Sequence, residues 1–109
     1  MEAGYQVEQG ILRIFLPEEL DHHVADKIRE ESETIMQQRQ IHQVIFDFSN
    51  TTFMDSSGIG MIIGRVKRMR GVKGEVIACH VTPQIHRILR MSKMQDVISI
   101  HMEEEEWTE

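Results

Sequence analysis

A short apolar strand, a polar turn and a strongly periodic helix follow one another in the middle of the chain. The strand is expected at Gln43–Phe48, where apolar and β-branched residues are consecutive, as in a strand buried on both faces. The helix is expected from about Ser57 to Arg70. Its apolar residues recur at helical spacing, at Ile59, Ile62, Ile63, Val66 and Met69. This order restricts the chain to folds in which helices pack on a sheet.

The flanking segments repeat this alternation. Further strands are expected, from their apolar and β-branched content, at Tyr5–Glu8, Ile11–Leu16, Glu75–Cys79 and Val97–Ile100. Further helices are expected at His22–Gln38, with Asp21 as N-cap, and after Thr82-Pro83. The pattern predicts an α/β fold with a small mixed, mostly parallel sheet and helices packed against it. In such sheets the functional site lies beyond the carboxyl ends of the strands.

Length and composition narrow the class of protein. We expect one domain spanning residues 1–109, with an acidic tail at 103–109 that is frayed or peripheral. A net charge of −6 argues against nucleic acid as the main partner, because binding phosphates requires a basic field. The local basic cluster Arg65–Lys73 is typical of a helix C-terminus balancing its dipole.

The single cysteine, Cys79, allows no intrachain disulfide and indicates a reducing compartment. Apolar runs are too short for a membrane span, and no secretion signal is visible at the N-terminus. We therefore expect a cytoplasmic protein, monomeric and without a membrane partner.

The turn Asp55-Ser56-Ser57-Gly58 lies at the mouth of the central helix. Free backbone N–H groups and the helix dipole make such a terminus suitable for an anion. A serine at this place can cap the helix, accept a phosphate or act as a nucleophile.

Three kinds of chemistry are poorly matched by the residues around this turn. Gly58, Gly60 and Gly64 resemble a loose dinucleotide fingerprint, but the next strand lacks a terminal acid and too little chain follows. The alternative is that Gly58 permits an unusual turn, and that Gly60 and Gly64 let the helix approach the sheet.

A nucleophile elbow needs a glycine two residues before the serine, which is absent here, and no base is recognisable. The doublet His22-His23 does not have metal-ligand spacing. We expect no cofactor and no metal, and a regulatory phosphoserine is the interpretation that these residues favour.

The segment Phe53–Gly60, with Gly64-Arg65 further along the helix, resembles the signature of the bacterial STAS-domain anti-sigma factor antagonists. Leu20-Asp21-His22-His23 resembles the second motif of the sporulation (SpoIIAA) type, and Met91-Ser92 resembles the end of its third helix. The resemblance covers almost the whole chain and implies a SpoIIAA-like fold.

The resemblance also implies a function without catalysis. The unphosphorylated protein would bind an anti-sigma factor that is also a GHKL-type serine kinase with bound nucleotide, and so release the sigma factor. The kinase would phosphorylate the first serine after the aspartate, Ser56, and a PP2C-type serine phosphatase would reverse this. Asp55, Ser57 and Gly58 would support the phosphorylation loop.

The implied partner-binding residues are Glu19, Leu20, Asp21, Asp55, Ser56, Ser57 and Ile59, with the first three expected beside the phosphorylation loop. Glu18, Lys73 and Lys93 depart from the family pattern, since glycine is usual at each position. A general-stress or stressosome-type STAS module and a small serine-nucleophile enzyme remain alternatives.

Overall fold

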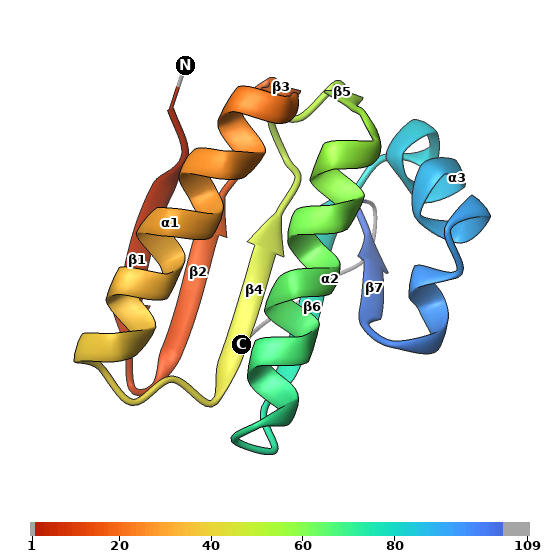
Figure 1. Cartoon of the computed structure of the whole chain (residues 1–109). Coiled ribbons are helices and arrows are strands. Elements are labelled where there is room, and N and C mark those ends of the chain that lie inside the picture. The colour runs from red at the N-terminus through yellow and green to blue at the C-terminus, as the bar shows by residue number, and fades with distance from the viewer. Residues whose placement is uncertain (1, 104–109) are drawn as a thin grey trace.

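The main sheet has five strands in the order β1-β2-β4-β6-β7 in the computed structural model, which describes residues 2–103 (Figure 1). The strands are β1 (Gly4–Glu8), β2 (Ile11–Phe15), β4 (Gln43–Asp47), β6 (Glu75–Val81) and β7 (Ser99–Met102). β1 is antiparallel to β2, and the other neighbours are parallel. The sheet is therefore mixed and mostly parallel, which confirms the predicted fold class.

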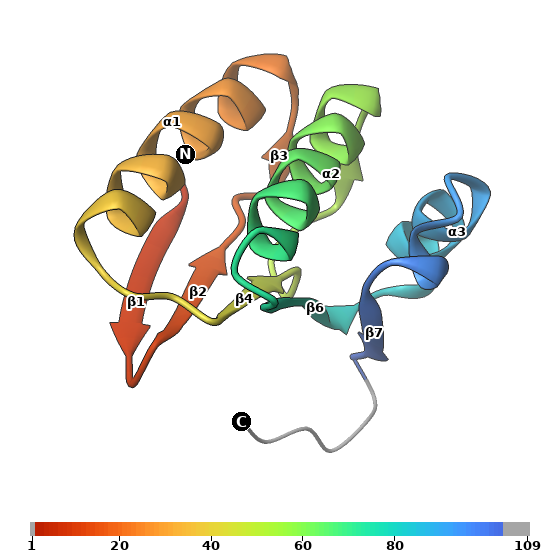
Figure 2. The same cartoon turned by 60° about the horizontal axis from the view of Figure 1, so that its bottom comes forward.

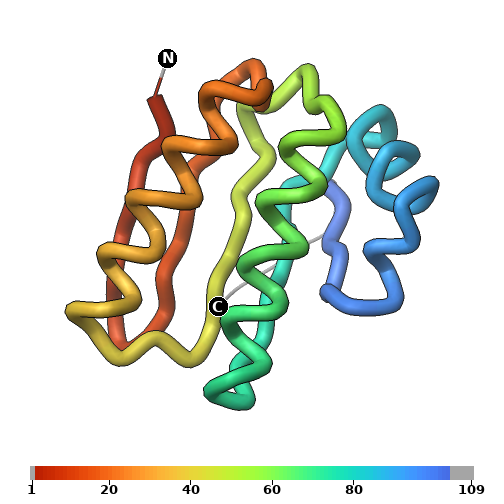
Figure 3. The backbone as a smooth tube through the Cα atoms, in the orientation of Figure 1, coloured from red at the N-terminus to blue at the C-terminus, as the bar shows by residue number. Residues whose placement is uncertain are grey.

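The helices α1 (His22–Gln38), α2 (Ser56–Arg70) and α3 (Pro83–Met91) lie on one face of this sheet (Figure 2). A short 3-10 helix, η1 (Met94–Asp96), follows α3. The two-residue strands β3 (Glu19–Leu20) and β5 (Phe53–Met54) form a second, parallel sheet (Figure 1). The backbone tube shows the chain passing from each of these segments directly into α1 or α2 (Figure 3). Sequence analysis did not predict this second sheet.

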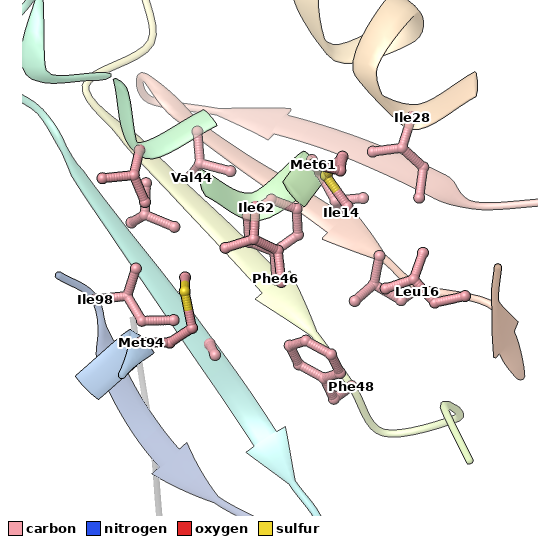
Figure 4. Close-up of a cluster of buried hydrophobic side chains, with 14 of the residues drawn as sticks. Ile14, Leu16, Ile28, Val44, Phe46, Phe48, Met61, Ile62, Met94 and Ile98 are labelled. Carbon is pink, nitrogen blue, oxygen red and sulfur yellow. The ribbon is translucent and has the colours of Figure 1, made fainter. Parts of the chain in front are cut away.

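The main core lies between the helices and the sheet (Figure 4). Alternate residues of the central strands point toward the helices, including Ile14 of β2 and Val44 and Phe46 of β4, and none of these side chains is exposed. Met61 and Ile62 of α2 pack against these side chains from the helix layer. The buried run predicted for β4 is thus confirmed.

Capping residues set the helix boundaries. The Asp21 carboxylate accepts a hydrogen bond from the Val24 N–H at 3.1 Å, and α1 has the predicted bounds. The Thr82 hydroxyl accepts one from the Ile85 N–H at 3.2 Å, as predicted for α3. α2 begins at Ser56 rather than Ser57, because Asp55 is its N-cap.

The last strand begins at Ser99, later than the predicted Val97. The N–H groups of Val97 and Ile98 both donate to the Met94 carbonyl, at 3.0 Å each, so this segment belongs to the turn that ends η1. Ile98 is buried in the core at that turn. Its apolar character therefore reflects packing in the main core and not strand pairing.

Two further findings bear on the sequence-based expectations. Among residues 2–103, no helix combines the length and the apolar composition needed to cross a membrane. The acidic tail predicted at 103–109 lies outside the described residues, apart from Glu103 in an exposed turn.

Candidate functional site

The second sheet holds two distant segments of the chain side by side at the carboxyl ends of the central strands. Glu19 pairs with Phe53, and Leu20 pairs with Met54. Further bonds extend the pairing on both sides, because the Glu18 carbonyl accepts from the Thr52 N–H at 2.8 Å. The segment before α1 is thus fixed beside the segment before α2, as expected for the turn Glu19-Leu20-Asp21 and the serine turn.

Gly58 lets these segments pack closely. A Cβ atom on Gly58 would lie 2.6 Å from Met54 Cγ and 3.0 Å from Leu20 Cγ. Gly58 lies within α2 and is not among the residues with positive φ, so the prediction of an unusual turn backbone is wrong. The prediction for Gly60 and Gly64 is also wrong, since a Cβ on either would meet nothing within 4 Å.

The first turn of α2 is capped by an aspartate. The Asp55 carboxylate accepts a hydrogen bond from the Ser57 N–H at 2.9 Å, and the Asp55 carbonyl accepts one from the Gly58 N–H at 3.1 Å. Ser56 is the first helical residue and its side chain is exposed. Neither serine is the N-cap, so the Ser56 hydroxyl stands at the helix mouth beside the capping carboxylate.

Exposure separates the residues that can touch a partner from those that position them. Glu18, Glu19 and Ser56 are exposed, and Phe53 presents 48% of its surface to solvent. Leu20 has no exposed surface, because its side chain lies under the loop against Gly58.

Asp21, Asp55, Ser57 and Ile59 are partly exposed. We take the exposed residues Glu18, Glu19, Phe53 and Ser56 as the candidate docking surface, whereas Leu20 can act only by holding the loop in place.

An ion-pair cluster fastens α2 to α1 further along the helix. The Arg65 guanidinium donates to the Glu33 carboxylate at 2.9 Å, and Arg68 donates to the same carboxylate at 3.1 Å. Lys67, Arg68 and Arg70 lie in the last turn of α2, as predicted for a cationic helix C-terminus, whereas Arg65 lies one turn earlier and is buried. The hydrogen bond from Arg65, followed by that from Arg68, lowers the pKa of Glu33 below its ordinary value.

A second polar cluster lies on the sheet face that has no helices. Asp47, Cys79 and His80 are the one group of three potential metal ligands among residues 2–103, with ligand atoms within 4.8 Å of one another. Arg13 donates to the Asp47 carboxylate at 2.8 Å and to the Cys79 sulfur at 3.8 Å, so a cation already faces two of these groups. Sequence spacing could not reveal this cluster, because Asp47 comes from β4 whereas Cys79 and His80 come from β6.

Hydrogen bonds keep Asp47 ionised in this cluster. Burial raises the pKa of Asp47, but hydrogen bonds from Ser49 and from the Arg13 guanidinium outweigh burial and hold that pKa below its ordinary value. The Ser49 N–H donates to Asp47 at 2.9 Å, at the start of the loop that leads to β5. Asp47 thus anchors both β2 and the loop before the site.

Backbone φ angles distinguish the three departures from the family pattern, Glu18, Lys73 and Lys93. Lys73 and Lys93 both have φ of 57°, in the left-handed region where glycine is the residue with least strain. Glu18 is not among the residues with positive φ, so its side chain fits without backbone strain. The two lysines affect turns distant from Ser56 in sequence, and Glu18 adds an exposed carboxylate to the candidate docking surface.

Comparisons with known proteins agree with this architecture. The family model for the STAS domain matches residues 3–107. An anti-sigma F factor antagonist of Paenibacillus polymyxa is 38% identical over 101 residues, covering 93% of this chain and 86% of the relative. An anti-sigma-B factor antagonist of Listeria monocytogenes is 27% identical, covering 80% of this chain and 75% of the relative.

Solved structures show the same fold. The unphosphorylated form of the anti-sigma factor antagonist SpoIIAA superimposes with a TM-score of 0.82 at 29% identity, covering 94% of this chain and 90% of that one. The phosphorylated form of the Bacillus SpoIIAA gives a TM-score of 0.74 at the same identity, covering 94% and 93%. The chain therefore belongs to the STAS-domain family, among the anti-sigma factor antagonists of the SpoIIAA type.

Proposed function

We propose that this chain is an anti-sigma factor antagonist whose activity is switched off by phosphorylation of Ser56. In the unphosphorylated form it binds an anti-sigma factor and so releases the sigma factor for transcription. The observation that carries the proposal is the exposed Ser56 at the first position of α2, next to the capping Asp55. The 38% identity to an anti-sigma F factor antagonist supports the choice of partner.

The helix mouth is suited to a residue that gains and loses a phosphate. A phosphoserine adds about −1.5 to −2 charges and three acceptor oxygens. The dipole and the free N–H groups of α2 favour that charge by roughly 0.3–1 kcal/mol, while the neighbouring Asp55 carboxylate opposes it. The fold can therefore accept the modification with little net change in stability.

A partner that covers this surface responds more strongly. Ser56 is exposed and follows β5 closely in the chain, and Phe53 of β5 pairs with the exposed Glu19 of β3, so a protein docked on these segments would bury the serine at the interface. A phosphate there must lose its hydration and meets the partner as a new dianion. A penalty of about 3 kcal/mol at that contact weakens binding about 100-fold.

Partner proteins carry out both the phosphorylation and the dephosphorylation. The anti-sigma factor is itself the proposed kinase, of the GHKL type with bound nucleotide, and a PP2C-type serine phosphatase restores the free serine. The chain contributes Ser56 as a substrate and has no catalysis of its own. Ser57 and Gly58 support the loop, through the cap bond to Ser57 and the close packing at Gly58.

Phosphopeptide mapping tests the site. The protein is incubated with the cognate anti-sigma kinase and ATP, and the labelled peptide is sequenced by mass spectrometry. We expect the phosphate on Ser56, its loss in Ser56→Ala, and its retention in Ser57→Ala as the matched control. A phosphate on Ser57, or none, would overturn the assignment.

A second candidate has one observation in its favour. Similarity to an anti-sigma-B factor antagonist, at 27% identity, allows a general-stress regulator with the same mode of action. Binding assays against both classes of anti-sigma kinase separate the two. We expect tighter binding to the sporulation-type kinase, and preference for the other class would reassign the partner.

A further inference from the structure

A cavity of about 580 Å³ lies at the end of α2 that is far from Ser56. Arg68 and Met69, in the last turn of that helix, line the cavity. The other walls are the turn between β1 and β2 and the segment 39–42 that joins α1 to β4, at the bottom of Figure 1. The volume falls within the range of about 300–1,000 Å³ that is typical of sites for small molecules.

Hydrogen bonds fix the walls of this cavity around His42. The His42 N–H donates to the Gly10 carbonyl at 2.9 Å, and the His42 carbonyl accepts from the Glu75 N–H at 3.1 Å. The His42 Nε2 lies 3.2 Å from the Gln9 carbonyl oxygen, and a Cβ on Gly10 would lie 2.5 Å from the imidazole ring. The cavity is therefore preformed, so a ligand would not have to order its walls.

Part of the lining is apolar. Met36 of α1, Ile41 before β4 and Met69 of α2 line the cavity and belong to the main core. Val72, just after α2, also lines it and has 51% of its surface exposed. The apolar part of a ligand would remove the remaining surface of these side chains from water.

Two arginines with free donors line the same cavity. Among residues 2–103, the Arg39 side chain has no hydrogen-bond or ion-pair partner. In the same part of the chain, Arg68 reaches Glu33 through Nε alone, at 3.1 Å, so its two terminal amino groups are free. None of the described residues that line the cavity is acidic.

Charge complementarity indicates the class of ligand. The two guanidinium groups carry full positive charges, whereas the C-termini of α1 and α2 contribute only about half a negative charge each. A basic cavity of this kind attracts anions locally, even in a chain of net charge −6. Guanidinium groups pair with carboxylates through two parallel N–H donors, and the apolar lining suits a hydrocarbon chain.

We propose that this cavity binds an amphipathic carboxylate. The carboxylate contacts Arg39 and Arg68, and the hydrocarbon chain lies on the apolar lining. The site is at the opposite end of α2 from Ser56, so binding can be measured in the absence of the anti-sigma factor and whether or not Ser56 is a phosphorylation site.

Titration of the isotope-labelled full chain with octanoate, followed by NMR, tests the proposal. We expect saturable shifts of the backbone amides at 9–10, 39–42 and 68–72. Octanamide, a neutral analogue with the same hydrocarbon chain, should bind at least about tenfold more weakly, because the charge-assisted hydrogen bonds are lost. Acetate, which has the carboxylate alone, should show no saturation over the same concentrations.

Substitutions then test the two arginines. Arg39→Gln and Arg68→Gln should each weaken octanoate binding about tenfold, and circular dichroism checks that both variants are folded. Arg70→Gln is the matched control, because Arg70 lies in the same helical turn without lining the cavity, and its affinity should be unchanged.

Three outcomes would overturn the proposal. They are the absence of saturable shifts at these amides, equal binding of octanoate and octanamide, and unchanged affinity in both Arg39→Gln and Arg68→Gln.

Discussion

The first turn of α2 exposes Ser56 to solvent, whereas a later turn of the same helix buries Arg65 against Glu33 of α1. The first turn is held by the hydrogen bond to the Asp55 cap and by the close packing of Gly58. The second region is held by an ion pair between two helices. The difference separates a surface that can be modified from a contact that fixes the helix, so changes at the two regions should have different consequences.

The largest loss of stability is expected from breaking the contact between the helices. Glu33→Gln leaves the buried Arg65 cation without its carboxylate, and Arg65 Nε already has no hydrogen-bond partner among residues 2–103. Because Glu33 is partly exposed, we expect a loss of about 2 kcal/mol, below the range for fully buried pairs. Urea unfolding measures this loss.

The exposed Glu30 of α1 provides the matched control. Glu30→Gln should change the free energy of unfolding by less than about 0.5 kcal/mol. Equal effects of the two substitutions would show that the ion pair does not hold α2 in place.

A smaller effect is expected at the site. Gly58→Ala places a methyl group against Met54 and Leu20, which costs about 1–2 kcal/mol after allowing for the better helix propensity of alanine. It should also weaken binding of the anti-sigma factor, because the Met54 and Leu20 side chains beneath the proposed docking surface must shift. Isothermal calorimetry and thermal unfolding measure the two effects.

Gly60→Ala is the control in the same helix. Its methyl group meets no atom within 4 Å, so we expect stabilisation of about 0.5–1 kcal/mol and unchanged binding. A stabilised Gly58→Ala with normal binding would contradict the role given to the close packing.

These two glycines also show what sequence could and could not predict. Helical spacing, the caps at Asp21 and Thr82, and the buried strand β4 follow from local patterns, and the structure confirms them. Gly58 and Gly60 are two residues apart in the same helix, yet only a Cβ on Gly58 would meet residues brought in by the second sheet. Strands of two residues carry too little pattern to be recognised.

Long-range contacts account for the other differences. The burial of Arg65 depends on Glu33, far away in the chain, and a basic residue in a helix otherwise reads as exposed. The cluster of Asp47, Cys79 and His80 likewise exists only once β4 and β6 pair. The site stays a prediction, in which the rule on the carboxyl ends of parallel strands and the serine turn point to the same place.

Acid should weaken the ion pairs that Glu33 and Asp47 make. Glu33 and Asp47 both have a pKa below the ordinary values of 4.5 and 3.8, so the unfolded chain binds more protons as the pH falls. Stability is then complete above these values and is lost as the pH falls through the lowered pKa values of the folded form. We expect a loss of about 1 kcal/mol or more between about pH 5 and pH 3.

Urea unfolding across this pH range tests the assignment. In Glu33→Gln the loss on acidification should be smaller, since one of the two carboxylates is gone. An identical pH dependence in the variant and the natural chain would contradict the contribution of Glu33.

The smallest effect concerns a departure from the family pattern. Lys93 adopts the left-handed region, so Lys93→Gly should stabilise by about 0.5 kcal/mol after the entropy of the unfolded glycine is counted. Lys67→Gly, at an exposed position in the last turn of α2, should instead destabilise by about 0.5–1 kcal/mol. Thermal unfolding of both variants measures the contrast, and destabilisation by Lys93→Gly would show that the side chain has another role.

The central claim is that the N-terminus of α2 accepts a phosphate on Ser56 without disturbing the fold, while binding of the anti-sigma factor is lost. The direct measurement compares the Ser56-phosphorylated and unphosphorylated chains in both urea unfolding and affinity for the cognate anti-sigma factor. We predict a change in unfolding free energy below about 1 kcal/mol, together with affinity reduced about 100-fold. Unchanged affinity, or a loss of stability as large as the loss of binding energy, would contradict the claim.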